Sequence, residues 1–172
     1  MTLGKRVWIA AASLLALAAG LRISHHFARP PVLHAGDRLL PFGLRSLAGD
    51  AVTLRASGRP QVINVFTTWC PVCRLEEPSL AALAKTLGAR GVEVIGIDQQ
   101  ESPEQVAHFR DQFALSFPLY IDAENLTHTL LGARVIPETV YVSADGVIRW
   151  IRQGPLTDGD IRALDRDTGR PV

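Results

Sequence analysis

With 172 residues, of which 47% are hydrophobic, the chain has room for one ordinary domain with its own core and an N-terminal appendage. A net charge of +1, with acidic and basic residues scattered and no basic stripe, argues against nucleic acid as a partner. The only two cysteines are separated by two residues. A disulfide across so short a loop removes little freedom from the unfolded chain, so we interpret the pair as chemical rather than structural.

Residues 1–23 have the pattern of a targeting segment. Lys5 and Arg6 precede an apolar run from Val7 to Leu21. That run is short for a membrane helix, which needs about 20 residues, and it equally fits the apolar region of a secretory signal. We favour an uncleaved signal anchor over a cleaved signal peptide, and both over a buried helix, because no polar face interrupts the run.

An anchor would place the rest of the chain at the cell membrane, outside the cytoplasm on the periplasmic side. Cleavage would instead leave a secreted or periplasmic protein. Residues 24–36 include Pro30, Pro31 and Gly36, a composition typical of an extended linker. We therefore expect the folded domain to occupy residues 37–172.

The elements predicted along this domain are two strands, then three alternations of strand and helix, then two strands and a helix. The expected strands are 39–44, 51–54, 62–66, 92–97, 117–122, 139–142 and 147–151, and the expected helices are 71–87, 102–113, 124–131 and 158–164. In the first helix, Leu75, Leu80, Leu83 and Leu87 are expected to share one apolar face. The alternation predicts parallel strands covered by helices on both sides, with the last two strands as an antiparallel hairpin.

The two cysteines lie where strand 62–66 is expected to pass into helix 71–87. Cys70 would start the helix, where unpaired N–H groups and the helix dipole favour a thiolate, the nucleophile of thiol-disulfide exchange. Pro71 suits the first helical turn, since its missing N–H would be unpaired anyway. Cys73, one turn on and less exposed, is near enough to resolve a mixed disulfide.

A bare Cys-x-x-Cys motif also resembles half of a zinc site. The sequence has no second cysteine pair, and its five histidines show no paired spacing near the motif. We therefore favour dithiol chemistry, with no metal and no cofactor.

The sequence Trp69-Cys70-Pro71-Val72-Cys73 after a strand, with Ile136-Pro137-Glu138-Thr139 much later, resembles the thioredoxin superfamily. More narrowly, residues 36–164 are similar to the membrane-anchored TlpA/ResA-type proteins, which include the cytochrome c biogenesis thioredoxins. The resemblance implies an α/β, thioredoxin-like three-layer sandwich with a mixed sheet and an N-terminal β-hairpin extension. Thioredoxins proper have a buried aspartate six positions before the first cysteine; here Asn64 stands there, as the resemblance to the ResA-type branch implies.

The resemblance also implies roles around the cysteines. Ile136-Pro137 would carry the family's cis-proline and turn the Ile136 backbone towards an extended substrate chain. Glu76, three residues after Cys73, would relay the proton of that thiol. A solvated helix charge, or a pair with Arg74 or Lys85, stays open for Glu76.

Trp69 is expected to shield the sulfur of Cys70 and to contact the partner protein. The alternative is that its side chain packs in the core. Glu77 and Glu138 are weaker candidates for a role at the site.

The function expected is thiol-disulfide oxidoreductase, with protein thiols or disulfides as substrates and a membrane or soluble thiol as electron donor. The resemblance implies that it works as a reductant, in cytochrome c maturation or on other cysteine proteins. One alternative is a peroxiredoxin-like peroxidase, suggested by Thr67 three residues before Cys70 but opposed by Ile63, where peroxiredoxins need proline. The other is a non-catalytic metal-binding or chaperone module.

Overall fold

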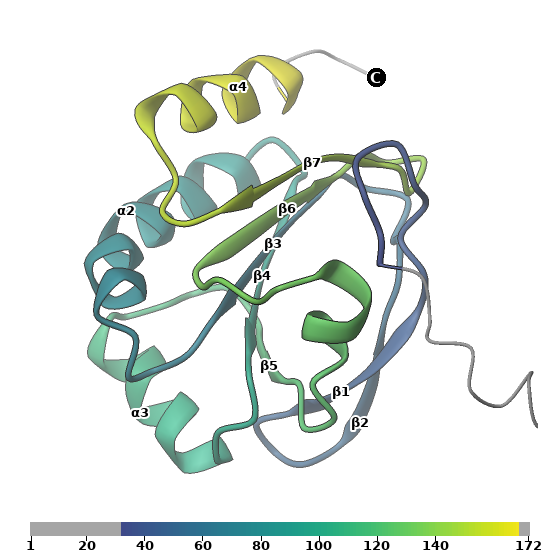
Figure 1. Cartoon of the computed structure of the whole chain (residues 1–172). Coiled ribbons are helices and arrows are strands. Elements are labelled where there is room, and N and C mark those ends of the chain that lie inside the picture. Colours follow the sequence, from purple (N-terminus) through teal and green to yellow (C-terminus); the bar gives the residue numbers. More distant parts are fainter. Residues whose placement is uncertain (1–31, 169–172) are drawn as a thin grey trace, which may run out of the picture. The chain divides into compact units, whose positions relative to one another are not determined.

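The computed structural model of the chain describes residues 32–168 (Figure 1). Its strands are β1 (Phe42–Ser46), β2 (Ala51–Leu54), β3 (Gln61–Phe66), β4 (Glu93–Asp98), β5 (Leu119–Ile121), β6 (Glu138–Val142) and β7 (Ile148–Gln153). Its helices are α2 (Pro71–Gly88), α3 (Pro103–Gln112), α4 (Asp158–Thr168) and the short π-helix η1 (Thr127–Leu131). The expected targeting segment lies outside the described residues. Within residues 32–168, no helix is both long and apolar enough to cross a membrane.

The seven strands form one mixed sheet in the order β2-β1-β5-β4-β3-β6-β7. The pairs β3–β4 and β4–β5 are parallel, and the other pairs are antiparallel. Both crossovers, through α2 and through α3, step the same way along the sheet. Because such crossovers are right-handed, α2 and α3 lie on the same face.

The sheet separates two apolar clusters. Val62 and Phe66 of β3 belong to the cluster under α2, α3 and α4, whereas Ile63 belongs to the cluster on the other face. That second face is covered by η1 and by the segment around Leu33 and Leu39. Helices therefore lie on both faces of the sheet, as expected, with the three α-helices on one face and η1 on the other (Figure 1).

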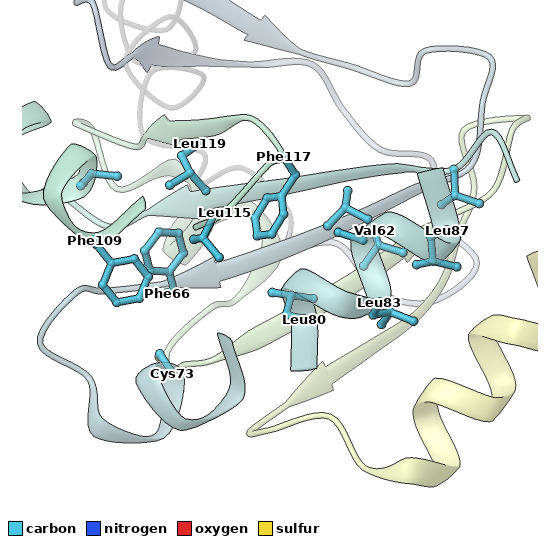
Figure 2. Close-up of a cluster of buried hydrophobic side chains, with 14 of the residues drawn as sticks. Val62, Phe66, Cys73, Leu80, Leu83, Leu87, Phe109, Leu115, Phe117 and Leu119 are labelled. Carbon is cyan, nitrogen blue, oxygen red and sulfur yellow. The ribbon is translucent and has the colours of Figure 1, made fainter. Parts of the chain in front are cut away.

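The first cluster extends along α2 to its first turn. Figure 2 shows Leu80, Leu83 and Leu87 of this helix, with Cys73 at the edge of the cluster. These side chains are 0–8% exposed. Burial of this size fixes α2 firmly on the sheet, so the cysteine pair stands on a rigid element.

The expected apolar face of α2 is wrong at one position. Leu75 is 81% exposed, whereas Glu77 is 2% exposed. Glu77 follows the buried Cys73 by four residues and therefore shares its face, while a residue two positions after Cys73 points almost the opposite way. The helix thus buries a carboxyl group and presents a leucine to solvent.

The local signals at the element ends are confirmed. Ser102 caps α3 and forms a capping box with Gln105.

The helix expected over 124–131 is instead the five-residue η1, because Asp122 accepts hydrogen bonds from the backbone N–H groups of Leu126 and Thr127. Gly132 ends η1 at a φ of 74°, in the left-handed region that glycine tolerates.

Candidate active site

Cys70 is the N-cap residue of α2, and its sulfur accepts a hydrogen bond from the backbone N–H of Cys73 at 3.2 Å. Pro71 occupies the first turn, as expected. Both thiols are free, and Cys70 is 5% and Cys73 1% exposed. Cys73 is thus the less exposed of the two thiols, as expected, but Cys70 is buried as well, with its sulfur against the Cys73 N–H.

Cys73 is held in its thiol form by its surroundings. Burial raises the pKa of this thiol far above its usual range, and the hydrogen bond to Cys70 acts in the same direction. The charges of Cys70 and Glu76 raise it further, against a hydrogen bond to the Thr67 backbone that lowers it. An attack by Cys73 therefore needs a group that takes its proton.

Glu76 lies half-buried beside the cysteines. Its Oε1 accepts a hydrogen bond from the backbone N–H of Leu156 at 2.7 Å. Burial raises the pKa of this carboxyl, and the bond to Leu156 opposes that rise. Arg74 is committed elsewhere, to the Thr68 carbonyl and the Gln112 side chain, so the expected alternative of a Glu76–Arg74 pair is not formed.

A cavity of about 300 Å³ lies beside Glu76, between α2 and the segment leading into α4. Apart from Glu76, Asp158 and Ser79, its walls are apolar: Val72, Leu75, Leu80, Leu83, Leu156 and Ile161 are among them. The carboxyl of Glu76 is thus both near the buried thiol and in contact with a space that a substrate side chain or water can enter.

The rim around Cys70 is apolar and exposed. Trp69 is 67%, Val72 40% and Leu75 81% exposed. The core-packing alternative for Trp69 is therefore wrong. Exposed apolar groups gathered around one reactive atom are typical of a surface that contacts another protein.

The Ile136–Pro137 peptide bond is cis, as expected. The carbonyl oxygen of Ile136 lies 4.0 Å from the sulfur of Cys70. This brings together two segments that are 66 residues apart. The second expected part of the site thus lies directly beside the first.

Two further carboxyl groups are buried near these elements. Burial, and then the charge of Glu76, raise the pKa of Glu77 to about 8. Glu138 follows the cis bond at the start of β6, and burial raises its pKa to about 7, while a hydrogen bond from Gln153 opposes the rise. One oxygen of each has no hydrogen-bond partner among the described residues. Both carboxyl groups therefore tend to hold a proton near neutral pH.

Asn64 occupies β3 under α2 and is 1% exposed. Its side-chain amide donates to the hydroxyl of Thr139 on β6 at 3.1 Å. A neutral hydrogen bond therefore stands at the position where thioredoxins proper have an aspartate.

Sequence reasoning missed the contacts of Thr68. Both oxygens of Glu101 accept hydrogen bonds from Thr68, one from its N–H and one from its hydroxyl. The two residues follow β3 and β4, which are adjacent parallel strands. Because the carboxyl ends of adjacent parallel strands meet at one edge, polar residues just beyond both strands are the signal that could have found this contact.

Among residues 32–168, no three or more histidine, cysteine, aspartate or glutamate side chains are grouped closely enough to hold a metal ion.

Comparison with known proteins agrees with this geometry. Residues 35–151 match the AhpC/TSA family. The thiol-disulfide oxidoreductase ResA of Halalkalibacterium halodurans is 30% identical over 158 residues, covering 90% of each chain. The thiol:disulfide interchange protein DsbE of Allochromatium vinosum is 34% identical over 167 residues, covering 90% of this chain and 87% of the relative.

Solved structures show the same fold. A thiol:disulfide interchange protein of the thioredoxin family from Chlorobium tepidum matches with a TM-score of 0.65 and 22% identity, over 80% of this chain and 98% of that one. StoA from Bacillus subtilis matches with a TM-score of 0.63 and 18% identity, over 81% of this chain and 100% of that one. The chain therefore has a thioredoxin-like fold, belongs to the AhpC/TSA family, and is a member of the thiol-disulfide oxidoreductases that include ResA and DsbE.

Proposed function

We propose that the chain reduces disulfides of client proteins, with Cys70 as the nucleophile and Cys73 as the resolving thiol. The thiolate of Cys70 attacks one sulfur of a client disulfide, and the other client sulfur leaves as a thiolate that takes up a proton. Cys73 then loses its proton and attacks the sulfur of Cys70, which releases the second client thiol. Two electrons pass to the client, and an external thiol donor returns the Cys70–Cys73 disulfide to the dithiol.

One observation carries this assignment: the sulfur of Cys70 accepts the N–H of Cys73 at the start of α2. A hydrogen bond to a negative sulfur is stronger than one to a thiol, and the helix dipole adds to it. At Cys73 a hydrogen bond to the Thr67 backbone lowers the pKa of the thiol, but burial, the larger effect, raises it far above its usual range. Cys70 is therefore placed to attack the client disulfide, and Cys73 keeps its proton until it resolves the mixed disulfide.

Glu76 is proposed to take the proton of Cys73 when that thiol attacks. Its charge acts on Cys73, and burial raises its own pKa, which brings the proton affinities of the two groups closer. The adjoining cavity gives the proton a path to solvent. The proposed role needs no movement of α2.

The client is proposed to bind across Trp69 and Pro71 on one side and Ile136 and Pro137 on the other. Trp69 supplies exposed apolar surface, and the backbone of Ile136, whose carbonyl oxygen lies 4.0 Å from the sulfur of Cys70, is placed to pair with an extended chain. Precursors of c-type cytochromes, which present cysteine pairs, are the client class we propose first.

We also propose that residues 1–23 tether the protein to the membrane, that residues 24–36 are a linker and that the domain from residue 37 works on the periplasmic side. A C-terminal reporter active only outside the cytoplasm tests the side, and the mass of the isolated protein tests cleavage. A soluble cytoplasmic protein with Met1 intact would contradict both parts.

Reduction of insulin by the full-length protein with dithiothreitol tests the proposed activity. Wild type should accelerate the reaction, and Cys70→Ser should return it to the uncatalysed rate. Cys73→Ser should instead accumulate mixed disulfides with clients, which mass spectrometry identifies. A Cys70→Ser variant as active as wild type would refute the assignment, and consumption of peroxide by the pure protein would favour a peroxidase.

A further inference from the structure

Thr68, two residues before Cys70, is held by a carboxylate from another part of the chain. Its N–H lies 2.5 Å from Oε2 of Glu101, and its hydroxyl lies 2.6 Å from Oε1. Both oxygens of Glu101 are thus used on one residue. Two hydrogen bonds to one carboxyl group fix the position of Thr68 and with it the loop that leads into Cys70.

The backbone of Glu101 is itself held by Asp98, the last residue of β4. The N–H of Glu101 donates to Oδ1 of Asp98 at 2.8 Å. Asp98 is 0% exposed, and its Oδ2 has no hydrogen-bond partner among the described residues. A carboxylate oxygen can only accept, so leaving it enclosed and unpaired is unfavourable, whereas a proton on it makes it a donor to a neighbouring carboxylate.

The charges around Asp98 favour that proton. Burial, and then a side-chain hydrogen bond to Glu101, raise the pKa of Asp98 to about 8, and the charges of Glu101 and Asp122 act in the same direction. Asp122, the residue after β5, accepts hydrogen bonds from the N–H groups of Leu126 and Thr127 and from the Thr127 hydroxyl. Asp122 is thus held by three donors of the segment that follows it.

A second contact holds Thr68 from the opposite side. Arg74, on the first turn of α2, donates to the Thr68 carbonyl at 3.1 Å. Its guanidinium also donates to Gln112 and lies over the rings of Phe109 and Phe113, at 5.6 and 5.2 Å from the ring centres. The N–H, hydroxyl and carbonyl of Thr68 thus all have hydrogen-bond partners, and among the described residues no hydrogen bond joins Glu101 to either sulfur.

We propose that Glu101 is a positioning residue for thiol-disulfide exchange, which holds the Cys70 loop through Thr68 and is itself held by the hydrogen bond from its N–H to Asp98. This inference rests on the proposed function of Cys70. Exchange requires three sulfurs in line, so a small displacement of Cys70 slows it strongly. Alkylation by a small reagent needs only an accessible thiolate.

The test compares two rates in the full-length protein across about pH 5 to 9: insulin reduction and alkylation of Cys70 by iodoacetamide. Glu101→Gln and Thr68→Val should each lower the high-pH plateau of insulin reduction by about tenfold. The double variant should be no slower than the slower single variant, because both changes act on the same contact between Thr68 and Glu101. Thr68→Ser should retain the wild-type plateau, and so should Glu104→Gln, an exposed carboxyl three residues from Glu101.

Three outcomes overturn the inference. The first is an unchanged plateau in Glu101→Gln; the second is a shift of the pH midpoint alone, which would make Glu101 a purely electrostatic neighbour of the thiol. The third is an equal loss in alkylation and insulin reduction together with a lower unfolding temperature, which would make the contact only structural. If Glu101→Gln fails to fold, Thr68→Val against Thr68→Ser decides the same question. A failure of the proposed function itself would show separately, as insulin reduction that survives Cys70→Ser.

Discussion

Replacing Glu77 by Gln tests whether α2 buries a neutral carboxyl group. Glu77 is 2% exposed, and its Oε2 has no hydrogen-bond partner among the described residues. Burial, followed by the charge of Glu76, raises its pKa from 4.5 to about 8. The folded protein therefore keeps the Glu77 proton at neutral pH, whereas the unfolded chain has released it.

This difference sets the sign and the size of the effect. Since the folded state binds the proton more tightly, the free energy of unfolding falls as pH rises from 4.5 to about 8. The difference between the two values is 3.5 pKa units, which at ~1.36 kcal/mol per unit corresponds to about 5 kcal/mol in all. Between about pH 5 and about pH 9, about 4 kcal/mol of this is lost. Glutamine has nearly the same shape and cannot ionise, so the variant should lack this loss.

Urea unfolding of the reduced full-length protein, at pH steps across this range, measures the effect. Asp98 and Glu138 also have raised pKa values, but they contribute equally to both proteins and cancel in the difference. Glu124→Gln, at an exposed carboxyl, is the control and should run parallel to wild type. Parallel curves for wild type and Glu77→Gln would refute the reasoning, because they would mean that Glu77 reaches water in the folded state.

Three further outcomes follow from the site and the core. Iodoacetamide should alkylate Cys70 before Cys73 in the reduced protein, as peptide mass mapping would show; the reverse order would contradict the assignment of the nucleophile. Glu76→Gln should slow oxidation of the dithiol by a factor at the low end of the ~10²–10⁴-fold range of general acid-base assistance, and alter the pH dependence of the rate. Superimposable stopped-flow rate profiles for wild type and variant would mean that Glu76 is only a solvated charge on the helix. Leu87→Ala should lower the free energy of unfolding by about 2–5 kcal/mol, because this side chain is 0% exposed between α2 and the sheet. A smaller loss would show that the neighbouring core side chains move in to fill the space.

The order of elements could be predicted because each is marked locally. The β-rich run before Cys70, the proline after it and the Ser102 cap are all signals within a few residues of the boundary they set. The cysteine pair could be placed at a helix start for the same reason. The cis bond at Ile136–Pro137 could be predicted only from the family resemblance, since a proline before a strand is ordinarily trans.

The face of α2 could not be predicted from hydrophobicity alone. Grouping leucines placed Leu75 in the core, whereas the structure buries Glu77 in register with Cys73. The apolar side chains of a helix normally decide which of its faces packs on the core. In α2 that face is defined by Cys73, Leu80 and Leu87, and Glu77 lies on the same face. The contact of Thr68 with Glu101 was missed because it spans 33 residues and depends on which strands are neighbours.

The buried carboxyl groups give the site a common electrostatic property. Glu77, Asp98 and Glu138 come from α2, β4 and β6, and burial raises the pKa of each to about 7 or 8. The charges that act on Cys73 are those of Cys70 and Glu76, and both raise the pKa of its thiol. As pH rises past about 7 to 8 the three buried carboxyl groups ionise while Cys73 still holds its proton. Alkali alone therefore does not prepare the resolving thiol for attack, and the second step depends on a group that takes its proton.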